Sequence, residues 1–344
     1  MRAVEKVKVL LIEDSGFMRI ILSDIIRKSK FLELAGSASN GLAGIEKVEE
    51  VSPDVILTDM IMPDYDGLYV VKKVKEKGLK IPVILLSSLE KASPKIFEAL
   101  NAGAFDFMDK PTEEQIENGY PELIQFIKVA AESNFSIEQS QFNKQNTFDH
   151  SFKEELNYKI IVIGASTGGP GALEFLLNNL PDNLAIPVLI VQHMPQRFIE
   201  TFTERLKLST GKKVVSAKIG TKIEPNYIYL APTDFNSKLV NKNGVSEIIK
   251  ENKVFAAYNN PSIDSMIESV ASIYRDKTIA CILTGMGKDG AASLMKVKEY
   301  GGLTIAQNQE SSVVYGMPKE AYDSGAAAHQ IDLKNFPAFI ISAL

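Results

Sequence analysis

The chain has 344 residues, of which 45% are hydrophobic and 24% are charged, and its formal net charge is −5. This length predicts two domains, the composition excludes a wholly disordered chain, and the negative charge gives no support to nucleic-acid binding. A single cysteine, Cys281, excludes an internal disulfide framework, and no apolar run reaches the roughly 20 residues of a membrane-spanning helix. We therefore expect a cytoplasmic protein with no signal peptide and no membrane insertion.

The first third of the sequence alternates short apolar runs with amphipathic stretches. Buried strands are predicted at Val7–Ile12, Phe31–Ala35, Val55–Thr58, Pro82–Leu86 and Phe105–Met108. Helices are predicted between and after them, at Gly16–Lys28, Gly41–Val51, Leu68–Glu76, Pro94–Asn101 and, as one long helix, from Thr112 to about Ser133. Such alternation is typical of βαβ units and predicts a flavodoxin-like, five-stranded parallel sheet in a domain of residues 1–131.

A polar segment, residues 132–156, is rich in Ser, Asn, Gln and charged residues, shows no sustained period and is predicted to be a linker. In the second domain, residues 157–344, strands are predicted at Lys159–Gly164, Ile186–Val191, Tyr227–Leu230, Thr278–Leu283 and Leu303–Ala306. Helical segments lie between most of them, which predicts a doubly wound α/β fold with Cys281 in its core. Two short runs around Asn-Gly within Lys238–Lys250 predict a small antiparallel hairpin.

Polar side chains follow several strands of the first domain, at the carboxyl edge where functional groups of a parallel sheet collect. They are Glu13, Asp14, Asp59, Ser87 and Lys110. Carboxylate oxygens suit Mg²⁺, and a carboxylate beside such an ion can attack phosphorus and form an acyl phosphate. Lys110 would neutralise the phosphoryl charge and the Ser87 hydroxyl would hydrogen-bond to it. The alternative is a set of ordinary polar loop residues.

Residues 5–130 resemble response-regulator receiver domains, in Glu13-Asp14 and in the segments TDMIMPDYDGL, LLSS and DFMDKP. The resemblance implies that a partner histidine kinase phosphorylates Asp59. It also implies a Mg²⁺ site formed by Asp14, Asp59 and the backbone carbonyl of Ile61, with Glu13 assisting through water. Phe107 occupies the aromatic switch position of these domains, and an ordinary core phenylalanine is the alternative.

A glycine-rich turn, KIIVIGASTGGPG at Lys159–Gly171, joins a predicted strand to a predicted helix. The turn holds no Lys, which excludes a Walker A loop, and Ser166 stands where the dinucleotide fingerprint needs a glycine. Residues 164–168 fit G-x-S-x-G, the nucleophile elbow, in the strand–turn–helix context that this motif requires. A structural turn or a helix N-cap serine is the alternative.

A serine nucleophile needs a base, and the chain has three histidines. His150 lies in the linker and His329 near the C-terminus, whereas His193 directly follows the second predicted strand of this domain, at the same sheet edge as Ser166. The loop after the fourth strand supplies Asp289. These three could act as nucleophile, proton shuttle and orienting carboxylate, although a buried structural histidine and a helix N-cap aspartate remain alternatives. The order Ser, His, Asp differs from that of α/β-hydrolases, subtilisins and chymotrypsins and disfavours a conventional lipase or peptidase.

Residues 158–344 closely resemble the catalytic domain of the CheB family, the chemotaxis protein-glutamate methylesterases and glutamine deamidases. The segments that carry the resemblance are IGASTGGPGAL, VQHMP, PSIDSM, LTGMGKDGA and AQNQESSVVYGMP. The resemblance implies a triad of Ser166, His193 and Asp289, supported at the oxyanion by the Thr167 side chain and by backbone N–H groups near Met286, with no cofactor in this site.

One departure concerns the loop APTDFN, where many members carry a His shortly after Ala-Pro-Gly and this chain has Thr233 and Asn236. The departure bears on the surface of that loop and leaves the triad residues in place.

The resemblance implies that the substrates are methyl-accepting chemoreceptors and that the phosphodonor is the histidine kinase of the chemotaxis system. It further implies that the unphosphorylated receiver covers the active-site edge and that phosphorylation of Asp59 loosens this contact. Two alternatives remain open: a phosphorylation-dependent binding module with a silent hydrolase domain, and a related methylesterase of a non-chemotactic signalling pathway.

Overall fold

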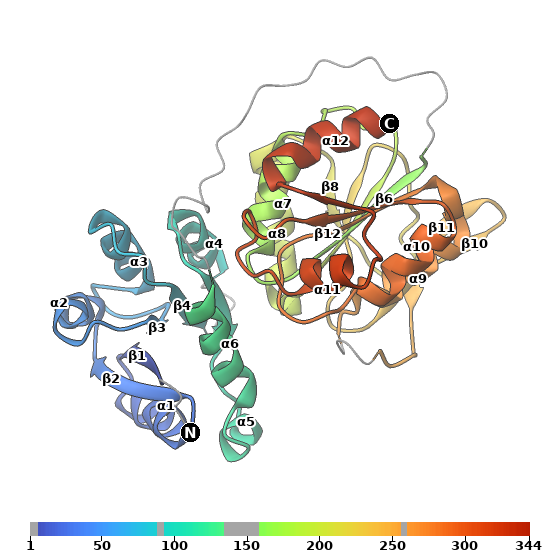
Figure 1. Cartoon of the computed structure of the whole chain (residues 1–344). Coiled ribbons are helices and arrows are strands. Elements are labelled where there is room, and N and C mark those ends of the chain that lie inside the picture. The colour runs from blue at the N-terminus through green and yellow to red at the C-terminus, as the bar shows by residue number, and fades with distance from the viewer. Residues whose placement is uncertain (1–5, 88–92, 134–157, 256–259) are drawn as a thin grey trace. The chain divides into compact units, whose positions relative to one another are not determined.

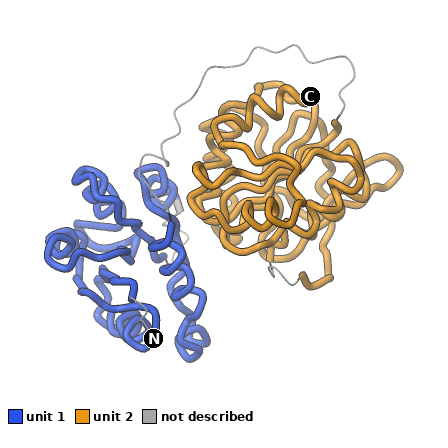
Figure 2. The backbone as a smooth tube through the Cα atoms, in the orientation of Figure 1, with its two compact units in different colours: residues 1–141 blue, residues 142–344 orange. Residues whose placement is uncertain are grey.

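The computed structural model describes residues 6–87, 93–133, 158–255 and 260–344. They belong to two compact units, residues 1–141 and residues 142–344 (Figures 1 and 2). The predicted linker at 132–156 falls outside the described residues except for Glu132, the last residue of a helix, and Ser133.

The first unit contains a five-stranded parallel sheet in the order β2-β1-β3-β4-β5. Its strands are β1 (Val7–Ile12), β2 (Leu32–Ala38), β3 (Val55–Asp59), β4 (Val83–Ser87) and β5 (Asp106–Asp109). Every residue of β3 and β4 is buried, as expected for central strands that are covered by helices on both faces. The prediction of a five-stranded parallel sheet is confirmed.

Around this sheet lie α1 (Gly16–Lys28), α2 (Gly41–Val51), α3 (Gly67–Glu76), α4 (Ser93–Ala102), α5 (Glu113–Glu117) and α6 (Pro121–Glu132). The single long helix predicted from Thr112 to Ser133 is wrong. Gly119 and Tyr120 adopt left-handed backbone conformations, with φ of 74° and 46°, which ends α5. Pro121 lacks an N–H group and has a fixed φ suited to a first helical turn, so α6 begins there.

The second unit contains a seven-stranded parallel sheet in the order β14-β13-β12-β6-β7-β9-β8, and a separate antiparallel hairpin. The strands of the sheet are β6 (Ile160–Ala165), β7 (Val188–Gln192), β8 (Val214–Ser216), β9 (Ile228–Leu230), β12 (Thr278–Ile282), β13 (Leu303–Gln307) and β14 (His329–Ile331). The hairpin consists of β10 (Ser237–Lys242) and β11 (Val245–Lys250), as predicted. Because the chain continues from β6 to β7 on one side and later returns to β12 on the other, the carboxyl end of β6 is the topological switch point of the sheet.

Among the described residues of this unit, six α-helices flank the sheet, which confirms the doubly wound fold: α7 (Gly169–Asn178), α8 (Gln196–Thr210), α9 (Ile263–Tyr274), α10 (Ala291–Glu299), α11 (Met317–Asp323) and α12 (Phe336–Ala343). Helix α10 packs on α9 and on α11, and all three pack on the central strands, while α7 packs on α8 and α12 (Figure 1). Cys281 lies fully buried in β12, and burial raises the pKa of its thiol, so the prediction of a core cysteine is confirmed. No helix among the described residues has the length and apolar character needed to span a bilayer.

Candidate active site

The first two predicted site residues of the second unit, Ser166 and His193, directly follow the paired strands β6 and β7. Their preceding residues, Ala165 and Gln192, face each other in the ladder, and the His193 N–H donates to the Ala165 carbonyl at 3.0 Å. The Gln192 side-chain amide donates to the carbonyls of both Ser166 and His193, at 2.9 and 3.0 Å. The register of two neighbouring strands therefore brings the serine and the histidine together at the switch point.

The glycines of the turn allow close packing around Ser166. A Cβ at Gly164 would lie 2.4 Å from the Ile263 side chain, and a Cβ at Gly168 would lie 2.6 Å from that of Val313. Gly168 also has φ of 74° and is the N-cap residue of α7. The interpretation of Ser166 as a helix N-cap is therefore wrong, and the half-buried serine stands in the turn before the helix.

His193 contacts the third predicted residue, Asp289, in a nearly dry environment. Its Nε2 lies 3.0 Å from Asp289 Oδ2, and the two side chains are 3% and 1% exposed. Asp289 lies 96 residues further along the chain, in the loop between β12 and α10. An ionised Asp289 fixes the neutral imidazole with its proton on Nε2, which makes Nδ1 the basic nitrogen of the ring.

The N-terminus of α9 holds the Asp289 carboxylate. The N–H groups of Ile263 and Asp264 donate to Oδ2 and Oδ1 at 2.7 and 3.0 Å, and the Ser262 hydroxyl donates to Oδ1 at 3.3 Å. A helix N-terminus favours a negative charge at this position. Burial opposes ionisation, but the hydrogen bond from His193 and these backbone N–H groups outweigh it, so the pKa of Asp289 lies below its ordinary value.

A third loop, at Gly285, closes the site next to Ser166. A Cβ at Gly285 would lie 2.6 Å from Ser166 Cβ, and the Ser166 N–H donates to the Thr284 carbonyl at 3.0 Å. The Thr284 hydroxyl donates to the Thr167 carbonyl at 2.9 Å. Thr167 and Met286, predicted to support the oxyanion, are therefore the chain neighbours of the two residues that meet here, Ser166 and Gly285.

Two residues of the APTDFN loop, where this chain differs from the family pattern, have structural roles that the sequence did not indicate. Asn236 is buried, and its Oδ1 accepts the Ser262 N–H at 2.8 Å. The Thr233 N–H and hydroxyl both donate to Gln196 Oε1, at 2.9 and 3.0 Å. Asn236 thus supports the segment that holds Asp289. The N-cap serine before an apolar run in PSIDSM was the available signal for that segment.

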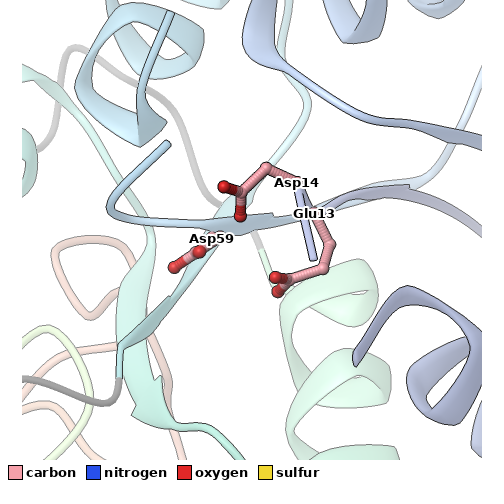
Figure 3. A group of neighbouring side chains, drawn as sticks. All are labelled: Glu13, Asp14 and Asp59. Atoms are coloured by element: carbon pink, nitrogen blue, oxygen red, sulfur yellow. The ribbon is translucent and has the colours of Figure 1, made fainter. Parts of the chain in front are cut away.

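The acidic cluster of the first unit also forms as predicted (Figure 3). Glu13 and Asp14 follow β1 and Asp59 ends the neighbouring β3, so one ligand oxygen from each lies within 4.8 Å of the others. The Lys110 ammonium contacts Glu13 Oε2 and Asp59 Oδ2, both at 2.8 Å. The donor set of three carboxylates fits Mg²⁺, which prefers hard oxygen ligands.

Burial governs the charges of this cluster. It raises the pKa values of Glu13 and Asp59 above their ordinary values, against the opposing hydrogen bond and charge of Lys110. Burial also opposes the Lys110 cation, but its hydrogen bonds to Asp59 and Glu13 outweigh this effect and raise the lysine pKa. Three neighbouring carboxylates with a single ammonium leave excess negative charge in a partly buried site, and a divalent cation would offset that charge.

The remaining predicted residues lie around this cluster. The Ser87 side chain is buried at the end of β4, and its hydroxyl makes no hydrogen bond to another described residue. The Ile61 N–H donates to Asp59 Oδ1 at 3.3 Å. Phe107 is half-buried and packs edge-to-face on Phe97, with 6.5 Å between ring centroids. The roles of Ser87, of the Ile61 carbonyl and of Phe107 as a switch stay predictions.

Each of the two parts of the chain matches a known protein family. Residues 161–340 match the family model "CheB methylesterase", and residues 9–118 match "Response regulator receiver domain". The protein-glutamate methylesterase/protein-glutamine glutaminase of Thermotoga maritima is 37% identical, over 97% of this chain and 98% of that protein. The protein of the same name from Clostridium acetobutylicum is 32% identical, over 98% of each. The crystal structure of the Thermotoga maritima CheB methylesterase catalytic domain covers 55% of this chain and 100% of its own, with 39% identity and a TM-score of 0.53.

Proposed function

The chain belongs to the CheB methylesterase family and carries a response-regulator receiver domain, and on this premise we propose that it is a phosphorylation-activated protein-glutamate methylesterase. It removes methyl esters from glutamate side chains of methyl-accepting chemoreceptors and deamidates glutamines there. The observation that carries the proposal is the 3.0 Å contact of His193 Nε2 with the buried Asp289 carboxylate. It is supported by the pairing of β7, which His193 follows, with β6, which Ser166 follows.

The chemistry is acyl transfer by a serine nucleophile. Ser166 Oγ attacks the γ-carbonyl of the methylated glutamate, and His193 takes the serine proton at Nδ1 because Nε2 is bound to Asp289. The imidazolium then returns this proton to the departing methoxide, and methanol leaves. Water, deprotonated by the same imidazole, hydrolyses the acyl-enzyme to glutamate and free serine. With a glutamine substrate the leaving group is ammonia.

The tetrahedral intermediate needs hydrogen-bond donors on its oxyanion, and the loops beside Ser166 supply them. The backbone N–H of Met286 follows Gly285, which packs against the serine, and Thr167 supports the same side. A preorganised donor of this kind typically contributes about 3 kcal/mol to the transition state. Asp289 stabilises the imidazolium and keeps the ring oriented.

The receiver domain accepts a phosphoryl group on Asp59 from the histidine kinase of the chemotaxis system. Mg²⁺, when bound, offsets the negative charges of the phosphoryl group and the carboxylates. The Lys110 ammonium and the Ser87 hydroxyl bind the phosphoryl oxygens. The aromatic ring of Phe107 acts as the switch that changes the receiver surface when Asp59 is phosphorylated. The groups that would hold the ion are Asp14, Asp59 and the Ile61 carbonyl, with Glu13 acting through water.

We assign the receiver to residues 1–131, the linker to 132–156 and the catalytic domain to 157–344 of a cytoplasmic protein. The unphosphorylated receiver inhibits the catalytic domain, and phosphorylation of Asp59 relieves this inhibition. A linker of this length keeps the receiver at a high effective concentration near the catalytic domain, so a few kcal/mol of differential contact changes activity by orders of magnitude.

Methanol release from methylated chemoreceptors tests this function. The full-length protein should release methanol slowly alone and faster with Mg²⁺ and a small-molecule phosphodonor, whereas Ser166→Ala should be inactive under both conditions. Deleting residues 1–150 should raise the basal rate, and an unchanged or lower rate would count against inhibition by the receiver. Receptor binding without methanol release from the intact chain would favour a binding module. Activity on other methylated proteins only would place the enzyme in a non-chemotactic pathway.

A further inference from the structure

A buried glutamine, Gln192, ends β7 directly before the proposed general base. It is 2% exposed, and it faces Ala165 in the last residue pair of the β6–β7 ladder. The nucleophile Ser166 and the base His193 therefore lie one residue beyond the paired part of these strands. Buried carbonyl groups that leave a ladder need other donors. The proposed mechanism so far gives the Gln192 side chain no role.

The Gln192 side-chain amide bridges the two loops at this point. Its Nε2 donates to the Ser166 carbonyl at 2.9 Å and to the His193 carbonyl at 3.0 Å. Both partners can only accept, so the amide nitrogen, and not Oε1, must face them. The two amide hydrogens thus extend the connection between the strands by one residue, from the ladder to the backbone of the nucleophile and the base.

Gly169, the first residue of α7, leaves the space in which this amide lies. A Cβ at Gly169 would be 2.1 Å from Gln192 Oε1 and 3.0 Å from Gln192 Cδ. Non-bonded carbon contacts are normally about 3.5–4.0 Å, so a side chain here would displace the end of the glutamine. Gly169 is not one of the glycines with positive φ. Space, and not backbone conformation, therefore requires a glycine at this position.

We propose that Gln192 is a positioning residue that fixes the spacing of Ser166 and His193, and that Gly169 is required because a side chain there would break this bridge. The inference rests on the proposed function, because it acts through the Ser166–His193 pair. A side chain as buried as that of Gln192 affects catalysis through these two residues and not through contact with the substrate. Without the bridge the two loops can shift apart, and a shift of about 1 Å can cost about 100-fold in rate.

Gln192→Met tests the bridge, because methionine fills a similar volume but has no N–H group to donate. In the full-length enzyme with Mg²⁺ and a small-molecule phosphodonor, methanol release from methylated chemoreceptors should show kcat lowered about tenfold or more. The value of KM should stay within about twofold of the parent value, since substrate binding does not involve Gln192. A kcat within about twofold of the parent value in folded Gln192→Met would refute the proposal.

Gly169→Ala tests the same bridge from the other side. The new Cβ can be accommodated when the flexible end of Gln192 moves away, so the protein should fold and kcat should fall about as far as in Gln192→Met. Gly171→Ala is the matched control, because it adds the same methyl group in the same turn of α7, where a Cβ meets nothing within 4 Å. Equal kcat values for Gly169→Ala and Gly171→Ala would contradict the role assigned to Gly169.

The double variant Gly169→Ala/Gln192→Ala shows whether both positions act through one contact. Truncation of Gln192 removes the atoms that the new Cβ would meet, so adding Gly169→Ala to Gln192→Ala should change kcat by no more than about twofold. An equal loss in both backgrounds would overturn the proposed link.

Thermal unfolding of the same full-length variants repeats this comparison without an activity assay. Gly169→Ala should lower Tm in the parent protein and have a smaller effect in Gln192→Ala, because the overpacking is relieved there. An equal decrease in Tm in both backgrounds would overturn the link between the two residues, and this test remains available if Gln192→Met misfolds. An inactive parent enzyme would refute the proposed function, whereas an active parent with parental kcat in Gln192→Met would refute this inference alone.

Discussion

Replacing Gly285 by alanine should reduce activity through steric displacement of Ser166, with no change in any ionisable group. A Cβ at this position would lie 2.6 Å from Ser166 Cβ and 2.7 Å from Met317 Sδ. Ordinary carbon contacts are about 3.5–4.0 Å, so the neighbours would have to move by about 1 Å. Met317 is fully buried at the start of α11, which limits its ability to yield.

The displacement should appear in both stability and catalysis. Overpacking of this kind costs about 1–3 kcal/mol of folding free energy. A nucleophile misplaced by about 1 Å can lose about 100-fold in rate, because the attacking atom no longer lies in line with the carbonyl. We therefore expect Gly285→Ala to lower kcat for methanol release by about 100-fold while the protein remains folded.

Gly171→Ala is the matched control, because a Cβ there meets nothing within 4 Å and the residue lies in the first turn of α7. It should keep full activity and gain about 0.5–1 kcal/mol of stability, since alanine is a better helix former than glycine. Methanol release and thermal unfolding of the two full-length variants measure these effects. If Gly285→Ala matches Gly171→Ala in kcat, Ser166 is not confined by the Gly285 loop as the structure indicates.

Three further predictions concern charged groups. Asp289→Asn replaces the carboxylate that accepts from His193 and from the N-terminus of α9 with an amide, which can no longer stabilise the imidazolium. Methanol release should therefore show kcat reduced about 10³-fold or more, with little change in KM. Lys110→Gln removes the ammonium between Glu13 and Asp59, so phosphodonor should no longer stimulate activity while the basal rate stays unchanged; stimulation of parental size would refute the assigned role. Because the folded-state pKa of Asp289 lies below the ordinary value of about 3.9, its carboxylate stabilises the fold above that value, and this contribution is lost as the pH falls through the folded-state pKa. The difference in the free energy of urea unfolding between the parent protein and Asp289→Asn should therefore shrink below about pH 4, and a difference that grows there would contradict this direction.

Local patterns were sufficient for those parts of the site that depend on strand ends. Parallel strands place their carboxyl ends at one edge, so Ser166 and His193 could be paired from the two apolar runs that precede them. The same argument brought Glu13, Asp14 and Asp59 together. These predictions needed only the position of each strand end to within one or two residues.

Short or interrupted elements were not predictable in the same way. The strands β8 and β14 have three residues each and lack the continuous apolar run that marks the equally short β9, and they form by pairing with β9 and β13. The break between α5 and α6 depends on left-handed backbone at Gly119 and Tyr120, whereas the apolar period continues through it. Tertiary pairing in the first case and backbone conformation in the second outweighed the local hydrophobic pattern.

The environment of Asp289 depends on packing between segments that are far apart in the sequence. The N-terminus of a helix holds this carboxylate better than a cationic side chain would. A lysine or arginine beside Asp289 would neutralise it before the reaction and would repel the imidazolium that His193 becomes. The N–H groups of Ile263 and Asp264 hold the same carboxylate by partial charges, so most of its negative charge remains available to His193. These dipoles are fixed by the fold of α9 and need no reorganisation when the proton moves from Ser166. The packing of α9 beside the switch point is therefore part of the catalytic machinery, although none of its groups is required to touch the substrate.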